Sequence, residues 1–169
     1  MSTGLVVFTA VHTAISLVAI AAGLVVLAGL IQSRRRDGWT GVFLAAAWAT
    51  TVTGFLFPFH GRTPALILGV ISLVPLALAS LARYRHRLAE GWRWIYVVCA
   101  GLALYFNCFV LVVQAFQKVP ALHALAPTET ESPFKVTQLT VLIVFVALTV
   151  VATRNFRVEP ELALPPLKG

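Results

Sequence analysis

An almost unbroken apolar run extends from Leu5 to Ile31 and is followed by the consecutive arginines Arg34, Arg35 and Arg36. A helix of about 20 apolar residues crosses the hydrocarbon core of a bilayer, so this run is long enough to span a membrane. A cleaved signal peptide has a shorter apolar core that is preceded, not followed, by basic residues. The first run is therefore predicted to remain in the protein as a transmembrane helix.

The composition of the whole chain agrees with a membrane protein. Hydrophobic residues make up 59% of the 169 residues and charged residues only 11%, whereas about a quarter of a soluble domain is charged. We predict an all-α, polytopic transmembrane helical bundle in one domain, 1–157, followed by a proline-containing cytoplasmic tail, 158–169. Its five spans are predicted at about 5–31, 39–59, 65–82, 92–117 and 136–153. A four-span arrangement stays open, with the last run as the one to lie outside the membrane.

The net charge of +7 reflects basic residues that gather at the ends of apolar runs. Such clusters set topology and contact lipids, so no nucleic-acid partner is expected. The five-span arrangement puts ten basic residues in the cytoplasm and Arg62, Lys118 and Lys135 outside, which places the N-terminus outside and the C-terminus in the cytoplasm. The ten are Arg34, Arg35, Arg36, Arg83, Arg85, Arg87, Arg93, Arg154, Arg157 and Lys168. Contacts with anionic headgroups are expected from Arg34, Arg35, Arg36, Arg83, Arg85 and Arg87.

Polar side chains are predicted to gather in the outer half of the bundle. On helical spacing, His12 and Ser16 share a face with Gly23, and Asn107 and Gln114 share one with Ala103. The candidates within the runs are His12, Ser16, Thr53, Asn107, Gln114 and Gln138. The candidates in the outer loops are His60, His123, Glu129 and Glu131.

Three interpretations of these polar residues stay open. They hold the helices together by hydrogen bonds; or they line a pocket for a small molecule, lipid or quinone; or His12 binds a metal or haem with His60 or His123. Aromatic side chains that could flank the pocket are Phe57, Phe59, Phe106 and Phe116.

The sequence lacks the residues and motifs that several kinds of chemistry require. No Asp or Glu lies within an apolar run, which argues against proton transport through a buried acid. The chain has no phosphate-binding glycine loop, no zinc-type spacing of Cys and His, and no nucleophile beside a base. We therefore expect a protein that is not an enzyme, has no cofactor, and assembles with a membrane partner or a second copy of itself.

The segments TGFLFPFHG, RWIYV and NCFVLVVQAFQKVPALHALAPT resemble a family of small uncharacterised bacterial inner-membrane proteins. The resemblance covers most of the chain from His12 to Arg157. It implies a bacterial inner membrane and a compact helical bundle, and it implies no activity for any residue. Our leading hypothesis is a small-ligand-binding or accessory subunit with a polar outer pocket; the alternative is a redox or transport protein that uses haem or quinone at His12.

Overall fold

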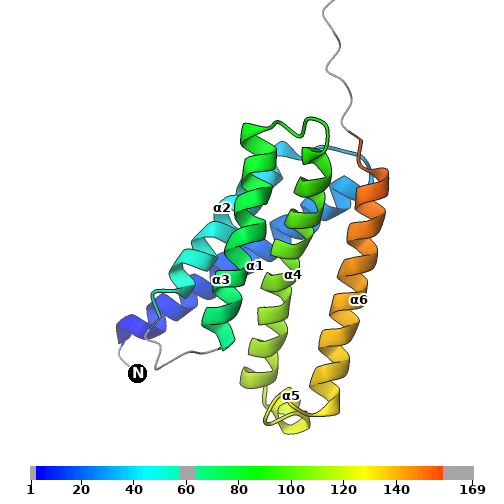
Figure 1. The fold of residues 1–169 in the computed structure, drawn as a ribbon. Helices are drawn as coiled ribbons and strands as arrows, with labels where there is room; N and C mark the ends of the chain where they lie inside the picture. The colour runs from blue at the N-terminus through cyan, green and yellow to red at the C-terminus, as the bar shows by residue number, and fades with distance from the viewer. Residues whose placement is uncertain (1–2, 58–63, 158–169) are drawn as a thin grey trace, which may run out of the picture.

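The computed structural model describes residues 3–57 and 64–157, and these residues form helices and their connections without a strand (Figure 1). The all-α prediction is confirmed for this part of the chain. The helices are α1 (Thr3–Ile31), α2 (Asp37–Gly54), α3 (Pro64–Ser80), a π-helical segment η1 (Leu81–Arg85), α4 (Trp92–Lys118), α5 (Pro120–Leu125) and α6 (Ser132–Asn155).

Four helices within the described residues are long and apolar enough to cross a membrane: α1, α3 with its continuation to Arg85, α4 and α6. This identifies a multi-pass membrane protein. The 18 residues of α2 span only about 27 Å, and they include Asp37 and several threonines and glycines. The sequence favoured the last run as the weakest span, which was wrong: α6 has 24 residues and sufficient hydropathy, and α2 is the helix that falls short.

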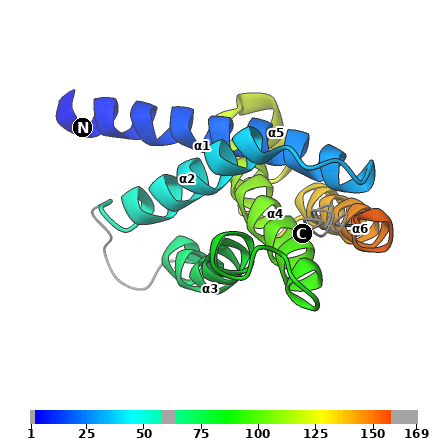
Figure 2. The ribbon, with the colours of Figure 1, turned by 90° about the horizontal axis from the view of Figure 1, so that it is seen from above.

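The helices form two groups that meet at one end. α3, α4 and α6 stand side by side, whereas α1 and α2 form an antiparallel hairpin that is strongly tilted against them (Figure 1). Seen from above, α3 and α6 are nearly end-on while α1 and α2 lie along the plane of view (Figure 2). The buried residues of α1 lie between Ala19 and Leu30, and those of α2 between Thr40 and Ala47. The hairpin thus packs on the rest through the halves next to its connecting turn.

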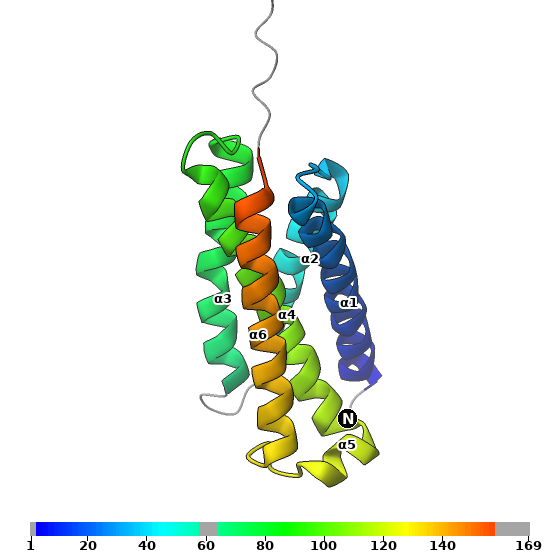
Figure 3. The same cartoon turned by 90° about the vertical axis from the view of Figure 1, so that its right-hand side faces the viewer.

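We call the end where these halves meet the basic end, because residues 34–36, 83–87, 93 and 154–157 bring their arginines to it. The opposite portion of the bundle is called the far half. There α5 lies crosswise between the end of α4 and the start of α6 (Figure 3).

Close helix contacts depend on two glycines. A Cβ on Gly23 of α1 would lie 2.6 Å from a methyl carbon of Leu104 and 2.9 Å from the ring of Phe43. A Cβ on Gly101 of α4 would lie 2.5 Å from the hydroxyl of Thr149 in α6. Small residues let helices approach closely in lipid, where no hydrophobic force draws them together.

Three connections differ from those expected from the sequence. Asp37 and Gly38, which precede the predicted span 39–59, already belong to α2, which fits the favourable position of a carboxylate at a helix N-terminus. The last helix starts at Ser132 instead of Val136, because a proline is tolerated in the first helical turn. The connection before it, expected as a loop, contains the short helix α5.

Candidate functional sites at the two ends of the bundle

The far half contains a hydrogen bond that joins the two helices of the hairpin. His12 Nδ1 lies 2.8 Å from Thr53 Oγ1, and the Thr53 hydroxyl lies 2.6 Å from the carbonyl oxygen of Ala49. A carbonyl only accepts, so the single hydroxyl proton of Thr53 is donated to the α2 backbone. His12 Nδ1–H must then be the donor to Thr53. In a neutral imidazole this leaves Nε2 as a hydrogen-bond acceptor.

One aromatic ring contacts this histidine, and a second ring packs against the first. The Phe57 ring is perpendicular to the His12 ring at a centroid distance of 5.0 Å, and Phe8 contacts Phe57 at 4.9 Å. Gly54 lies beside the imidazole, since a Cβ there would be 3.8 Å from His12 Cε1. Ser16, expected on the same face, donates its hydroxyl to the His12 carbonyl and so serves its own helix.

The other polar candidates in the apolar runs are not joined to His12. Asn107 donates to the Ala103 carbonyl of its own helix at 2.9 Å. Gln114 is half-buried and has no hydrogen bond among the described residues. Gln138 of α6 donates to the Phe109 carbonyl of α4 at 3.2 Å, while its buried Oε1 has no partner there. The predicted polar residues therefore do not form one hydrogen-bonded cluster; His12 and Gln138 each join a different pair of helices.

The outer-loop histidines do not form a cluster in the part of the chain that can be described. His60 and Phe59 lie outside the described residues. His123 is exposed on α5. Within 3–57 and 64–157, no three His, Cys, Asp or Glu side chains are grouped so as to hold a metal ion.

The two candidate glutamates organise the connection between α5 and α6. Glu129 accepts a hydrogen bond from the Gln117 amide at 2.6 Å. Glu131 accepts one from the Thr128 hydroxyl at 2.7 Å and others from the backbone N–H groups of Thr128 and Thr130. The Thr128 hydroxyl, followed by these backbone donors, holds the pKa of Glu131 below its ordinary value. Both carboxylates therefore have structural partners.

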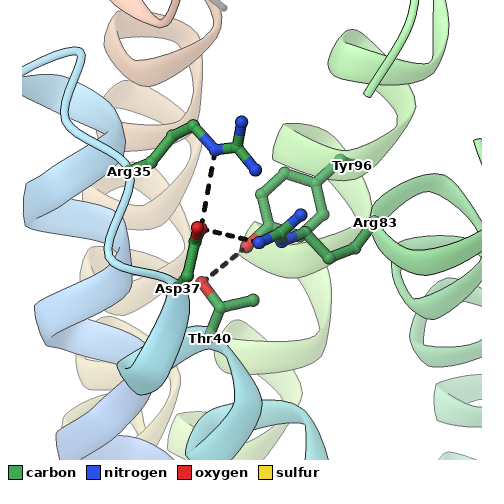
Figure 4. A network of polar contacts seen from close by, with 5 residues as sticks. All are labelled: Arg35, Asp37, Thr40, Arg83 and Tyr96. Carbon is green, nitrogen blue, oxygen red and sulfur yellow. Dashed lines mark hydrogen bonds and ion pairs between the residues drawn. The ribbon is translucent and has the colours of Figure 1, made fainter. Parts of the chain in front are cut away.

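The basic end contains a polar cluster that was not foreseen. Asp37 Oδ1, at the start of α2, lies 2.6 Å from Arg83 Nη2 of η1 and 3.5 Å from Arg35 Nε (Figure 4). The Arg83 side chain is only 14% exposed. A guanidinium that is so largely buried requires an anionic partner, and the Asp37 carboxylate is that partner. The ion pair joins the hairpin to the α3–α4 connection.

Two buried hydroxyls lie beside this ion pair. Thr40 of α2 is 4% exposed and Tyr96 of α4 is 2% exposed, and their oxygens are 3.3 Å apart (Figure 4). One hydroxyl donates to the other, which uses one of the two protons. No acceptor for the second proton lies among the described residues.

The end of α6 is attached to the same region. The Asn155 amide donates to the Ile31 carbonyl at 3.0 Å, and the Arg157 backbone N–H donates to the Ser33 hydroxyl at 3.0 Å. Arg93 donates to the carbonyl of Phe156, whose ring is buried. The turn after α1, the start of α4 and the end of α6 are thus fixed to one another.

A recess with a cavity volume of about 10 Å³, at the lower limit for one water molecule, opens at this cluster. We call it the arginine recess. Its lining consists of Val26, Leu30, Arg34, Arg35, Arg36, Asp37, Thr40, Arg83, Leu88, Tyr96 and Phe156. The sequence contains one signal for the arginine recess, since Asp37 directly follows the three consecutive arginines. No other residue that lines the recess is acidic.

The fold and the apolar helices define the class of this protein, an all-helical multi-pass membrane protein. Comparison of the chain with known protein families, with curated proteins and with solved structures finds no match.

Proposed function

We propose that the protein is a non-enzymatic, small-ligand-binding or accessory subunit of a bacterial inner membrane, with its ligand site at His12 in the far half. The observation that carries this proposal is the hydrogen bond between His12 and Thr53. It directs Nδ1–H toward α2 and leaves Nε2 of the neutral ring as an acceptor, among half-buried aromatic side chains.

The chemistry of this site favours a ligand with a hydroxyl or N–H donor on an apolar or aromatic body. The donor would bind His12 Nε2, and the body would pack against Phe57 and Phe8. Small-molecule sites typically combine an apolar lining with a few placed polar groups. A quinol or the hydroxyl of a lipid meets this description.

For topology we propose five spans, with the N-terminus and the far half outside. α2 runs antiparallel beside α1 over its length (Figures 1 and 2), so a membrane that α1 crosses also surrounds α2. The excess of arginine at the basic end favours placing that end in the cytoplasm. A cytoplasm-dependent reporter fused after Gly169 should be active; activity of a periplasm-dependent reporter at that position would contradict this orientation.

Haem- or quinone-linked redox or transport chemistry is the alternative, and the same hydrogen bond favours it. A metal-binding histidine commonly donates its second ring N–H to an acceptor, which fixes the tautomer, as His12 does to Thr53. His12 would supply one haem ligand, and His60 or His123 the other. A Soret band in the purified protein that disappears in His12→Ala would support haem; a spectrum without that band after haem loading would exclude it.

The test of the ligand site uses protein purified in mild detergent, with bound small molecules and lipids identified by mass spectrometry. We expect His12→Ala to lose the copurifying ligand and Thr53→Val to retain about tenfold less, the value of one hydrogen bond of about 1.4 kcal/mol. Thr51→Val is the matched control, because that hydroxyl donates to the Ala47 carbonyl of its own helix. Equal ligand retention in wild type and His12→Ala would overturn the proposal.

A further inference from the structure

We propose that the arginine recess at the basic end is a binding site for a phosphate group. The site lies at the opposite end of α1 from His12 and is independent of the proposed ligand site. Its phosphate could belong to an anionic lipid headgroup or to an anion in solution, which present the same chemistry to arginine.

The charge of the lining is the first argument. Four arginines, Arg34, Arg35, Arg36 and Arg83, face a single carboxylate, so the recess carries a net charge of +3. Asp37 makes ion pairs with two of them. Arg34 and Arg36 have no ion pair within the described part of the chain. The lining therefore has more positive charge than its own residues neutralise.

Arg83 is the second argument. Its guanidinium has five N–H donors in a fixed plane, and one of its nitrogens is paired with Asp37. The other two guanidinium nitrogens make no hydrogen bond with described residues. Neither of them is a fully buried atom without a partner, so both are accessible. A mostly buried guanidinium with accessible, unused donors can bind a phosphate oxygen beside Asp37.

The hydroxyl pair is the third argument. Thr40 and Tyr96 both line the recess and are almost fully buried. Their mutual hydrogen bond leaves one proton without an acceptor among the described residues. A phosphate oxygen accepts such a proton, so a neutral donor complements the arginines at the base of the recess.

The recess as observed holds no more than about one water molecule, so a phosphate requires a small rearrangement. Arg35 is the residue that provides it. Its contact with Asp37 is long, at 3.5 Å, and both side chains are exposed. Exposed ion pairs of this kind contribute little to stability. The Arg35 side chain can therefore leave Asp37, which opens the recess, and then contact the bound phosphate from the solvent side.

The decisive experiment compares two arginine substitutions of equal charge. Arg34→Gln removes a side chain that lines the recess, and Arg85→Gln removes an arginine at the same end that does not. Binding is measured in detergent by native mass spectrometry with added phosphatidylglycerol or phosphatidylcholine, and by thermal shift with inorganic phosphate. We expect Arg34→Gln to weaken binding about tenfold, as for loss of a charged hydrogen bond, and Arg85→Gln less than about twofold.

Tyr96→Phe is the second variant, since it keeps the buried ring and removes only the hydroxyl. It should weaken phosphate binding while its circular dichroism spectrum stays that of the wild type. Saturable binding of phosphatidylglycerol alone identifies the lipid headgroup as the source, and saturable binding of inorganic phosphate identifies an anion from solution. Equal weakening by Arg34→Gln and Arg85→Gln, or no saturable binding of either probe, would overturn the site.

Discussion

Asp37 Oδ1 and Arg83 Nη2 lie 2.6 Å apart and form an ion pair between the first residue of α2 and the π-helical segment that ends α3. This contact matters because the hairpin of α1 and α2 packs on the other helices mainly near the basic end. An ion pair at that junction stabilises the tilted arrangement of the two groups, not only a local turn.

We expect Asp37→Asn to lower the free energy of unfolding by about 1–2 kcal/mol. The substitution leaves the mostly buried Arg83 guanidinium without its anion, although exposure of Asp37 limits the loss. Reversible denaturation in detergent micelles measures the effect. Glu90→Gln is the control, because Glu90 is an exposed carboxylate at the same end with no ion pair among the described residues. Equal stability of the two variants would contradict a structural role for the Asp37–Arg83 pair.

The hydroxyl pair should show strong non-additivity in a double-mutant cycle. Tyr96→Phe and Thr40→Val each remove one partner of the 3.3 Å hydrogen bond, and each should cost about 1 kcal/mol. The double variant replaces both partners with apolar groups of similar shape, and it should cost less than the sum of the two. The same denaturation assay in phosphate-free buffer gives all four corners of the cycle. Strict additivity would show that the two hydroxyls do not interact.

The sequence predicts the helices well because apolar length is a local property. Four of the predicted spans correspond to helices that are long and apolar enough to cross a membrane. The second run was harder, since Phe59 and the residues around it contribute hydropathy that α2, which ends at Gly54, does not contain. Five spans thus remain our proposal.

The sites were less predictable, because hydrogen-bond partners come from distant parts of the chain. His12 and Asn107 were both candidates for hydrogen bonds between helices, yet His12 bonds to Thr53 on α2 and Asn107 to the Ala103 carbonyl of its own helix. Tyr96 was not among the candidates, and only the packing of α4 against α2 shows that it is buried beside Thr40. Residue type indicated which side chains were candidates, and it could not pair them.

Glu131 should show a pH-dependent contribution to the structure around the start of α6. Its folded-state pKa is depressed, first by the Thr128 hydroxyl, so its contribution is present above the ordinary glutamate pKa of about 4.3. The contribution is lost as the pH falls through the folded-state pKa. Thr128→Ala should raise the pKa of Glu131 toward its ordinary value, as measured by carboxyl NMR titration in micelles. Thr137→Ala should leave it unchanged, because that hydroxyl donates to Pro133; an unchanged pKa in Thr128→Ala would contradict the assignment.

Gly23 should be one of the positions in α1 where a single methyl group is destabilising. Alanine is favoured over glycine within a helix by about 1 kcal/mol, so Gly38→Ala, whose Cβ would meet nothing within 4 Å, should keep or raise stability. At Gly23 the same Cβ would overlap Leu104 and Phe43, both of which are 1% exposed and enclosed by other side chains. Overpacking of this kind costs about 1–3 kcal/mol, which outweighs the gain in helix propensity. The denaturation midpoint of Gly23→Ala should therefore fall, while that of Gly38→Ala should stay the same or rise. An unchanged or raised midpoint in Gly23→Ala would show that α1 does not pack against α2 and α4 as closely as the structure shows.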